Sequence, residues 1–143
     1  MILLDTTVLC YAVGSEHTYR EPTRRLLGAI RNGELRASTT VQVVQEFVHV
    51  RSRRRGREDA AELATAYLRL LSPLAVADED VLDDALRLFV ATPGLGSFDA
   101  LLAATVLRQS DTLVSADRAF AGVRGLRHLI PDAAGVDGLL ARS

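Results

Sequence analysis

Four acidic residues, widely separated in the sequence, stand where carboxylates could do chemistry together. Asp5 directly follows the apolar run 1–4, and Asp117 follows a second apolar run, 112–115, after one intervening residue. Short runs of this kind are typical of buried strands in a parallel sheet. Because ligands collect at the carboxyl ends of such strands, we expect these two carboxylates at the same edge of one sheet.

The other two acids, Asp99 and Glu46, lie in segments with helical periodicity. Asp99 is in the first turn of a predicted helix, where the helix dipole also stabilises a carboxylate. Glu46 interrupts an otherwise apolar, largely buried stretch, and helical spacing places it on one stripe with Gln42 and His49. That stripe either faces water or lines a polar cavity. Each acid alone has an ordinary structural explanation, so the indication of a site comes from the set.

Converging carboxylates repel one another and raise one another's pKa, and a bound cation removes this conflict. Oxygen ligands with no accompanying Cys and few His favour Mg²⁺ or Mn²⁺ over Zn²⁺. Magnesium keeps several waters, one of which can become the nucleophile, and it withdraws charge from a phosphate under attack. The acids therefore indicate phosphodiester hydrolysis with one metal ion or two.

Apolar runs alternate with amphipathic segments, which predicts an α/β protein with a parallel sheet. The expected strands are 2–4, 35–38, 74–76, 112–115 and 126–129, and the expected helices are 7–12, 22–32, 41–54, 59–71, 79–91, 98–109 and 133–141. Asp78 and Ser97 are expected N-caps, Pro22 suits the first turn of its helix, and Gly33 closes that helix.

Composition is that of an ordinary globular chain, and we expect one domain over residues 1–143. It is 48% hydrophobic and 24% charged, and no apolar run approaches the ~20 residues that span a bilayer. The N-terminus lacks the pattern of a secretory signal, and a single cysteine, Cys10, excludes an internal disulfide framework. The default expectation is a cytoplasmic protein without a membrane segment.

All 17 basic residues are Arg, whose planar fork suits phosphate. Five of them crowd into the run 51–57, at the end of the helix that carries Glu46. They could hold the phosphates beside a cleaved bond, or equally favour a helix C-terminus and keep the surface soluble. The RNA-binding candidates in this run are Arg51, Arg53, Arg54 and Arg55.

Other side chains give weaker signals. With 5% aromatic residues and no Trp, extensive base stacking is not expected, and Tyr11, Tyr19 and Tyr67 are expected to pack. The histidines show no HxH or HExxH spacing, which argues against a zinc site. Cys10 is expected as a small core residue.

In order along the chain, the motifs LDTT at 4–7, EF at 46–47, FDALLAA at 98–104 and LVSADRAF at 113–120 closely resemble the PIN-domain family. Within it, they look like the VapC-type toxins of bacterial type II toxin–antitoxin pairs. The resemblance implies a three-layer α/β/α fold around a central, mainly parallel sheet of four or five strands. It also implies an endoribonuclease that uses Mg²⁺, with Mn²⁺ as a substitute, and hydrolyses RNA through a metal-activated water.

Carried over by matching positions, the resemblance makes four residues the catalytic, metal-binding quartet: Asp5, Glu46, Asp99 and Asp117. Asp5 and Asp99 are then the expected direct ligands. Glu46 and Asp117 would bind a second metal, bind through water, or orient the attacking water. Thr7 and Ser115 match small polar positions that support the site. The family often has Ser or Asn at the first and Thr at the second, so a hydroxyl is kept at both.

The resemblance further implies a cognate VapB-type antitoxin that lays an extended or helical segment in a groove and places an Arg in the acidic pocket. The apolar faces around Leu63, Leu70 and Leu86 could form that groove or a homodimer interface.

Alternative functions fit the residues less well. A PIN-like module that binds RNA or protein without cutting would be favoured by loss of an acid, and all four are present. Dehalogenase-like phosphatases need a second Asp where Thr7 stands, and receiver domains need a Lys, which this chain lacks.

Overall fold

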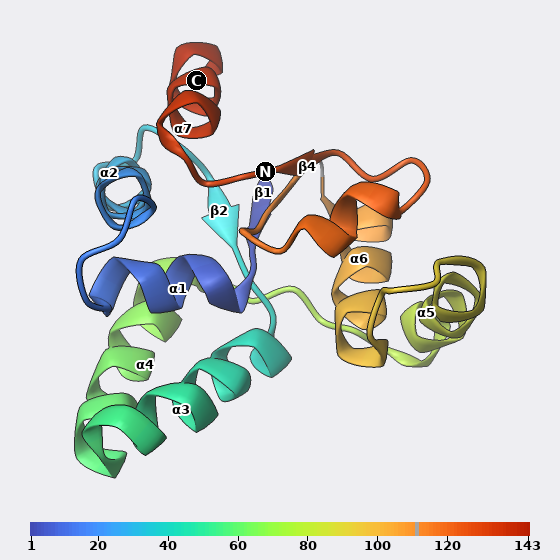
Figure 1. Cartoon of the computed structure of the whole chain (residues 1–143), viewed down its shortest axis with the longest axis horizontal. Coiled ribbons are helices and arrows are strands. Elements are labelled where there is room, and N and C mark those ends of the chain that lie inside the picture. The colour runs from blue at the N-terminus through green and yellow to red at the C-terminus, as the bar shows by residue number, and fades with distance from the viewer. Residues whose placement is uncertain (111) are drawn as a thin grey trace.

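A computed structural model describes residues 1–110 and 112–143 (Figure 1). Its elements, in chain order, are β1 (Ile2–Leu4), α1 (Thr6–Val13), α2 (Arg20–Arg31), β2 (Ala37–Ser38), α3 (Val41–Arg55), α4 (Arg57–Leu71), α5 (Glu79–Ala91), α6 (Ser97–Gln109), β3 (Thr112–Val114), the 3₁₀ helix η1 (Arg118–Gly122), β4 (His128–Leu129) and α7 (Ala133–Arg142). Each helix predicted from periodicity begins and ends within two residues of its observed bounds.

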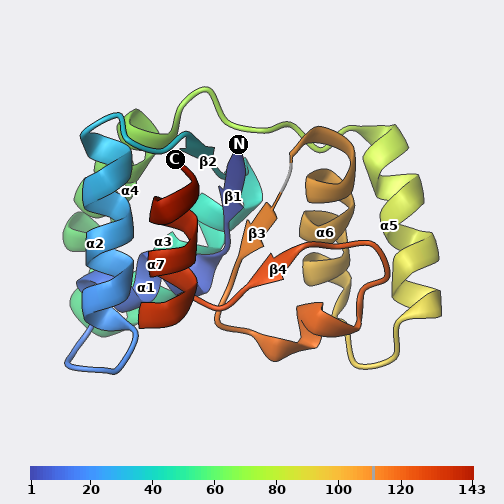
Figure 2. The same cartoon turned by 90° about the horizontal axis from the view of Figure 1, so that it is seen from above.

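Over the described residues, a single four-stranded sheet runs in the order β2-β1-β3-β4, and every neighbouring pair is parallel. Figure 2 shows α5 and α6 on one side of the sheet and the other α-helices gathered toward its opposite side. All residues of β1 and β3 are buried, as the apolar runs predict for central strands. The predicted three-layer α/β/α fold is confirmed.

The strand order places a topological switch point between β1 and β3. The chain leaves β1 to reach β2 on one side, and later returns to pair β3 on the other. In parallel sheets the crevice at such a point, outside the carboxyl ends, is where ligands bind. The backbone N–H of Asp5 donates to the Val114 carbonyl at 3.0 Å, so the loops after β1 and β3 begin side by side.

The predicted strand 74–76 is wrong. In the described chain this segment makes one isolated bridge, between Thr40 and Ala75, with the Ala75 N–H donating to the Thr39 carbonyl at 2.9 Å. Pro73, just before it, has no N–H with which to extend the pairing. The fourth strand is instead the short β4, within the predicted range 126–129.

One predicted cap is also wrong. Gly96, not Ser97, is the N-cap of α6, and its carbonyl accepts from the Ala100 N–H at 2.9 Å. Ser97 is already the first helical residue. The Asp78 side chain does cap α5 by accepting from the Val81 N–H at 3.0 Å, and Gly33 closes α2 with a positive φ of 77°.

Helix α3 is less buried than its composition suggests. Of its residues, all of which are described, just Val43 and Phe47 are buried, whereas Glu46 is exposed and Val41 is 58% exposed. The helix packs mainly on α4, where Phe47 meets the Tyr67 ring edge-on with centroids 5.1 Å apart. Its polar stripe is therefore free to line a cavity.

Tyr67 also ties α4 to α1. Its buried hydroxyl donates to the Leu9 carbonyl at 2.8 Å, and burial raises its pKa above the ordinary value. The contact fixes the helix that begins beside Asp5 and carries Thr6 and Thr7. No helix in the described ranges has the length and apolar character to cross a membrane.

We expect Tyr67→Phe to lower the free energy of unfolding by about 1 kcal/mol, because it removes one buried hydrogen bond and keeps the ring contact with Phe47. Tyr67→Leu should cost more, because it removes both. Urea unfolding midpoints measure the difference, and an unchanged midpoint in Tyr67→Phe would contradict a role for the hydroxyl in holding α1.

Candidate active site

Asp5 is the buried anchor of the site, with a side chain only 5% exposed. Its Oδ2 accepts hydrogen bonds from the Ser115 hydroxyl at 2.6 Å and from the Thr7 hydroxyl at 3.2 Å. Those hydroxyl oxygens themselves accept from the backbone, Ser115 from the Asp117 N–H at 3.0 Å and Thr7 from the Ala116 N–H at 2.9 Å. The carboxylate is thus held in one orientation.

The same contacts join three elements around Asp5. Thr7 comes from α1 and Ser115 from the end of β3, while His128 of β4 contacts the Ser115 carbonyl through Nε2 at 2.9 Å. The two side chains that the resemblance matched to supporting positions therefore both reach the first acid. Their different identities from the common pattern do not prevent this contact, since each keeps a hydroxyl.

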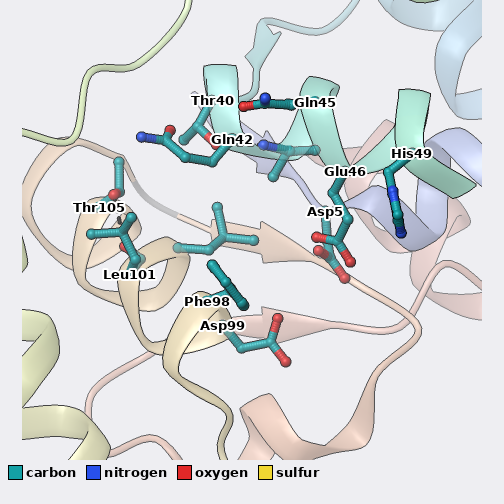
Figure 3. Close-up of a pocket in the computed structure, with 12 residues that line it drawn as sticks. Asp5, Thr40, Gln42, Gln45, Glu46, His49, Phe98, Asp99, Leu101 and Thr105 are labelled. Carbon is teal, nitrogen blue, oxygen red and sulfur yellow. Dashed lines mark hydrogen bonds between the residues drawn. The ribbon is translucent and has the colours of Figure 1, made fainter.

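The remaining acids approach Asp5 from different elements. Glu46 projects from α3, and its Oε2 accepts from the Thr6 hydroxyl at 3.0 Å. Asp99 lies in the first turn of α6, and Asp117, which N-caps η1, is near enough for its charge to raise the pKa of Asp99. In Figure 3 the carboxylates of Asp5, Glu46 and Asp99 gather at one end of a cavity. All four acids line a pocket of about 360 Å³ at the switch point.

Electrostatics set this group apart from the surface acids. Burial raises the pKa of Asp5 above its ordinary value, and the hydrogen bonds from Ser115 and Thr7 only partly oppose it. The pKa of Asp99 rises to about 6, first through burial and then through the charges of Asp5, Asp117 and Glu46. The neighbouring carboxylates therefore make Asp99 harder to ionise than burial alone would.

The donor chemistry fits a hard divalent cation, which would remove this repulsion. All four groups offer oxygen, and the charges of Asp5, Asp117 and Glu46 act on Asp99 and raise its pKa, as expected of carboxylates that lie near one another. Within residues 1–110 and 112–143, no three or more His, Cys, Asp or Glu side chains are already close enough together to hold a metal ion.

A second cavity, of about 460 Å³, opens on the other side of Glu46 between α3 and α6. Asp5, Glu46 and Asp99 form one end of it, and Figure 3 places Leu101 and Thr105 toward the other. Phe98 also lines this cavity and is 83% exposed. We name it the α3–α6 groove. Its apolar lining was not anticipated from the sequence, because it depends on how two distant helices face each other.

The arginine run divides into two parts. The Arg51 Nε and Nη2 donate to the Asp59 carboxylate at 2.6 and 3.4 Å, and Nη1 donates to the Val13 carbonyl at 3.0 Å. Arg51 thus joins α3 to α4 and α1, and its donors are occupied by protein. Arg53, Arg54 and Arg55 are exposed, and Arg54 lines the acidic pocket. Of the four arginines predicted to bind RNA, these three therefore remain candidates.

Sequence reasoning missed Thr6 and misjudged the surroundings of Cys10. Thr6 orients Glu46, and the only sequence signal was its place beside Thr7 after a strand. Cys10 is half-buried: it packs against the core, as predicted, but it also lines the acidic pocket. Burial raises the pKa of its thiol to about 11, which keeps it protonated and a poor nucleophile.

Comparisons with known proteins show the family and the fold. The sequence pattern of the PIN domain matches residues 2–126. Ribonuclease VapC7 of Mycobacterium tuberculosis is 50% identical, with 98% of each chain covered. Two solved structures share the fold at low identity. FitAcB from Neisseria gonorrhoeae has a TM-score of 0.74 at 20% identity, covering 92% of this chain and 98% of that one. VapBC2 from Rickettsia felis has a TM-score of 0.71 at 18% identity, covering 91% and 98%.

The raised pKa of Asp99 predicts how stability depends on pH without metal. Between 3.8, its ordinary pKa, and about 6, the folded protein holds a proton that the unfolded chain has released. This contribution to stability is therefore complete below the lower value and is lost as the pH rises through the higher one. We expect Asp99→Asn to remove that loss, so the variant gains stability over the wild type across this range.

Urea unfolding in EDTA at a series of pH values measures the effect. The matched control is Asp80→Asn, an exposed first-turn acid on α5, which should keep the wild-type pH dependence. Parallel pH curves for wild type and Asp99→Asn would show that folding does not raise the pKa of Asp99.

Proposed function

The chain belongs to the PIN-domain family as a VapC-type ribonuclease toxin, and from this premise we propose that it cuts RNA with Mg²⁺ held by Asp5, Glu46, Asp99 and Asp117. The observation that carries the proposal is the meeting of these four acids in one pocket at the β1/β3 switch point. Mn²⁺ would substitute, because it accepts the same oxygen ligands.

Asp5 and Asp99 would hold the ion directly. When bound, the ion supplies a Lewis acid that makes a coordinated water more acidic and offsets charge on the scissile phosphate. The chain's own groups do the positioning. Ser115 and Thr7 keep the Asp5 carboxylate turned toward the pocket, and Thr6 holds Oε2 of Glu46. The other Glu46 oxygen would be placed to accept a proton from the attacking water, and Asp117 would orient that water.

The substrate is a polyanion approaching an acidic pocket, so basic groups must border it. Arg54 lines the pocket, and Arg53 and Arg55 are next to Arg54 in the last turn of α3. We assign these three to the phosphates that flank the cut. Because its substrate is RNA, we also assign the protein to the bacterial cytoplasm.

The partner is a cognate antitoxin, and we propose that one of its segments lies in the α3–α6 groove. The groove is long, mostly apolar and closed at one end by three acids, so it suits an apolar segment that ends in a basic side chain. For the homodimer we favour the exposed apolar stripe of α5, where Leu82, Leu86 and Phe89 follow helical spacing. Leu63 and Leu70 are partly buried against the core and are less suited to either contact.

Two substitutions test the acid quartet. Asp99→Asn and Glu46→Gln should each lower metal-dependent cleavage of total RNA by roughly 100-fold or more, because each removes a charge that positions the ion or accepts a proton. Asp80→Asn on α5 and Glu62→Gln on α4 are matched exposed acids and should cleave like the wild type. Gel analysis with Mg²⁺, Mn²⁺ or EDTA gives the rates, and full activity in Asp99→Asn would remove it from the proposed site.

Replacing Arg53, Arg54 and Arg55 with Gln tests the basic border. RNA binding should weaken, and its logarithmic salt slope should flatten by about 0.7 for each phosphate that is no longer neutralised. Fluorescence anisotropy of a labelled RNA across salt concentrations measures this, with the exposed Arg69→Gln on α4 as a control. An unchanged slope would mean that these arginines serve only the helix end and solubility.

A further inference from the structure

Three aromatic rings form a cluster at the wall of the acidic pocket. The rings of Tyr11 and His17 are stacked, with centroids 4.4 Å apart and planes 26° from parallel. Tyr19 meets both edge-on, at 5.4 Å from Tyr11 and 5.2 Å from His17. The Tyr19 N–H donates to His17 Nδ1 at 3.1 Å, which fixes the imidazole. His17 is nevertheless exposed, so the cluster is a braced surface and not part of the core.

The cluster is continuous with the acids. Tyr11 and His17 line the same 360 Å³ pocket as Asp5, Asp99 and Asp117. Tyr11 stands four residues after Thr7 on α1, and so on the same helix face, one turn or about 6 Å further from Asp5. That separation is on the scale of a single nucleotide.

The opposite wall of the pocket also presents residues at one-turn intervals, and two of them are charged. On α3, Glu46, Val50 and Arg54 follow one another at intervals of four residues and all line the pocket. The pocket therefore runs from carboxylates to a stacked ring pair, with an arginine on its opposite side.

We propose that this end of the pocket is a nucleobase subsite, in which a base of the RNA next to the cut stacks on the His17–Tyr11 pair while Arg54 contacts its phosphate. The inference rests on the proposed ribonuclease function and adds residues that would hold one base of the substrate beside the cut. Base stacking on exposed rings is favourable and tolerant of base identity. Because Nδ1 of His17 accepts from the Tyr19 N–H, its Nε2 is the ring nitrogen left to donate to a base edge.

A base fits this place better than a protein segment does. The α3–α6 groove, on the other side of Glu46, offers the apolar lining that a peptide needs. The ring cluster instead adjoins Arg54 and opens onto the acids, which suits a planar group attached to a phosphate.

The test asks whether loss of the His17 ring and loss of one base lower cleavage through the same contact. Wild-type protein with Mg²⁺ is first used to map a cut site in total RNA, and a synthetic single-stranded oligoribonucleotide spanning that site is then made. In a series of oligonucleotides, each nucleotide near the cut is replaced in turn by an abasic residue. Cleavage by wild type, His17→Ala, His17→Phe and Thr18→Ala is compared, the last being an exposed control in the same loop.

We expect one abasic position to lower wild-type kcat/KM by about tenfold, mainly through KM. On the intact RNA, His17→Ala should lose about as much kcat/KM as the wild type loses at the abasic position. The abasic substitution should then cause no further loss in His17→Ala. His17→Phe should keep the wild-type response because it keeps a ring, and Thr18→Ala should match wild type. Equal urea midpoints for the variants separate this coupling from loss of fold.

Three results would contradict the proposed base subsite, and each has a different meaning. If His17→Ala responds to every abasic position as the wild type does, the subsite is wrong and the ribonuclease stands. If His17→Ala cleaves normally but binds antitoxin more weakly, the rings serve a protein partner and the base subsite is overturned. If the wild type cuts no RNA with Mg²⁺, the proposed function fails and this inference fails with it.

Discussion

The site depends on a buried carboxylate that forms no ion pair within the described residues. Asp5 is 5% exposed, and its burial is tolerated because the Ser115 and Thr7 hydroxyls donate to the same oxygen. This arrangement requires β1 and β3 to be neighbours, and it fixes where the loop to Asp117 begins. With Asp99 nearby, the apo fold carries electrostatic strain that a positive group relieves. A metal ion and a basic side chain from a partner can both meet that need.

The four acids differ in how firmly they are held and in how exposed they are. Asp5 is held by hydrogen bonds at the end of a buried strand, whereas Glu46 and Asp117 are exposed and Asp99 is half-buried. The rigid residue fixes the position of the site, and the more exposed ones remain accessible to ligand and water. Two cavities meet at these acids, one bordered by aromatic rings and Arg54 and the other with a mostly apolar surface, so the substrate and the partner that we propose would have separate approaches.

Much of this could be predicted from the sequence, because parallel sheets place their carboxyl ends together and apolar periodicity marks the elements. The strand before Asp5, the helix that carries Glu46 and the first turn around Asp99 all follow from local pattern. Contacts between separate elements could not be predicted. Tertiary packing alone brings Asp59 to Arg51 and His17 onto Tyr11, and it reduces the apolar run 74–76 to one bridge.

The central claim is that four acids form one cation site, and calorimetric titration of the purified protein with Mn²⁺ tests it most directly. Wild type and the exposed control Asp80→Asn should bind the ion alike. Asp5→Asn, which keeps the shape of the side chain but removes its charge, should bind far more weakly. Binding that is absent in the wild type, or undiminished in Asp5→Asn, would contradict the account.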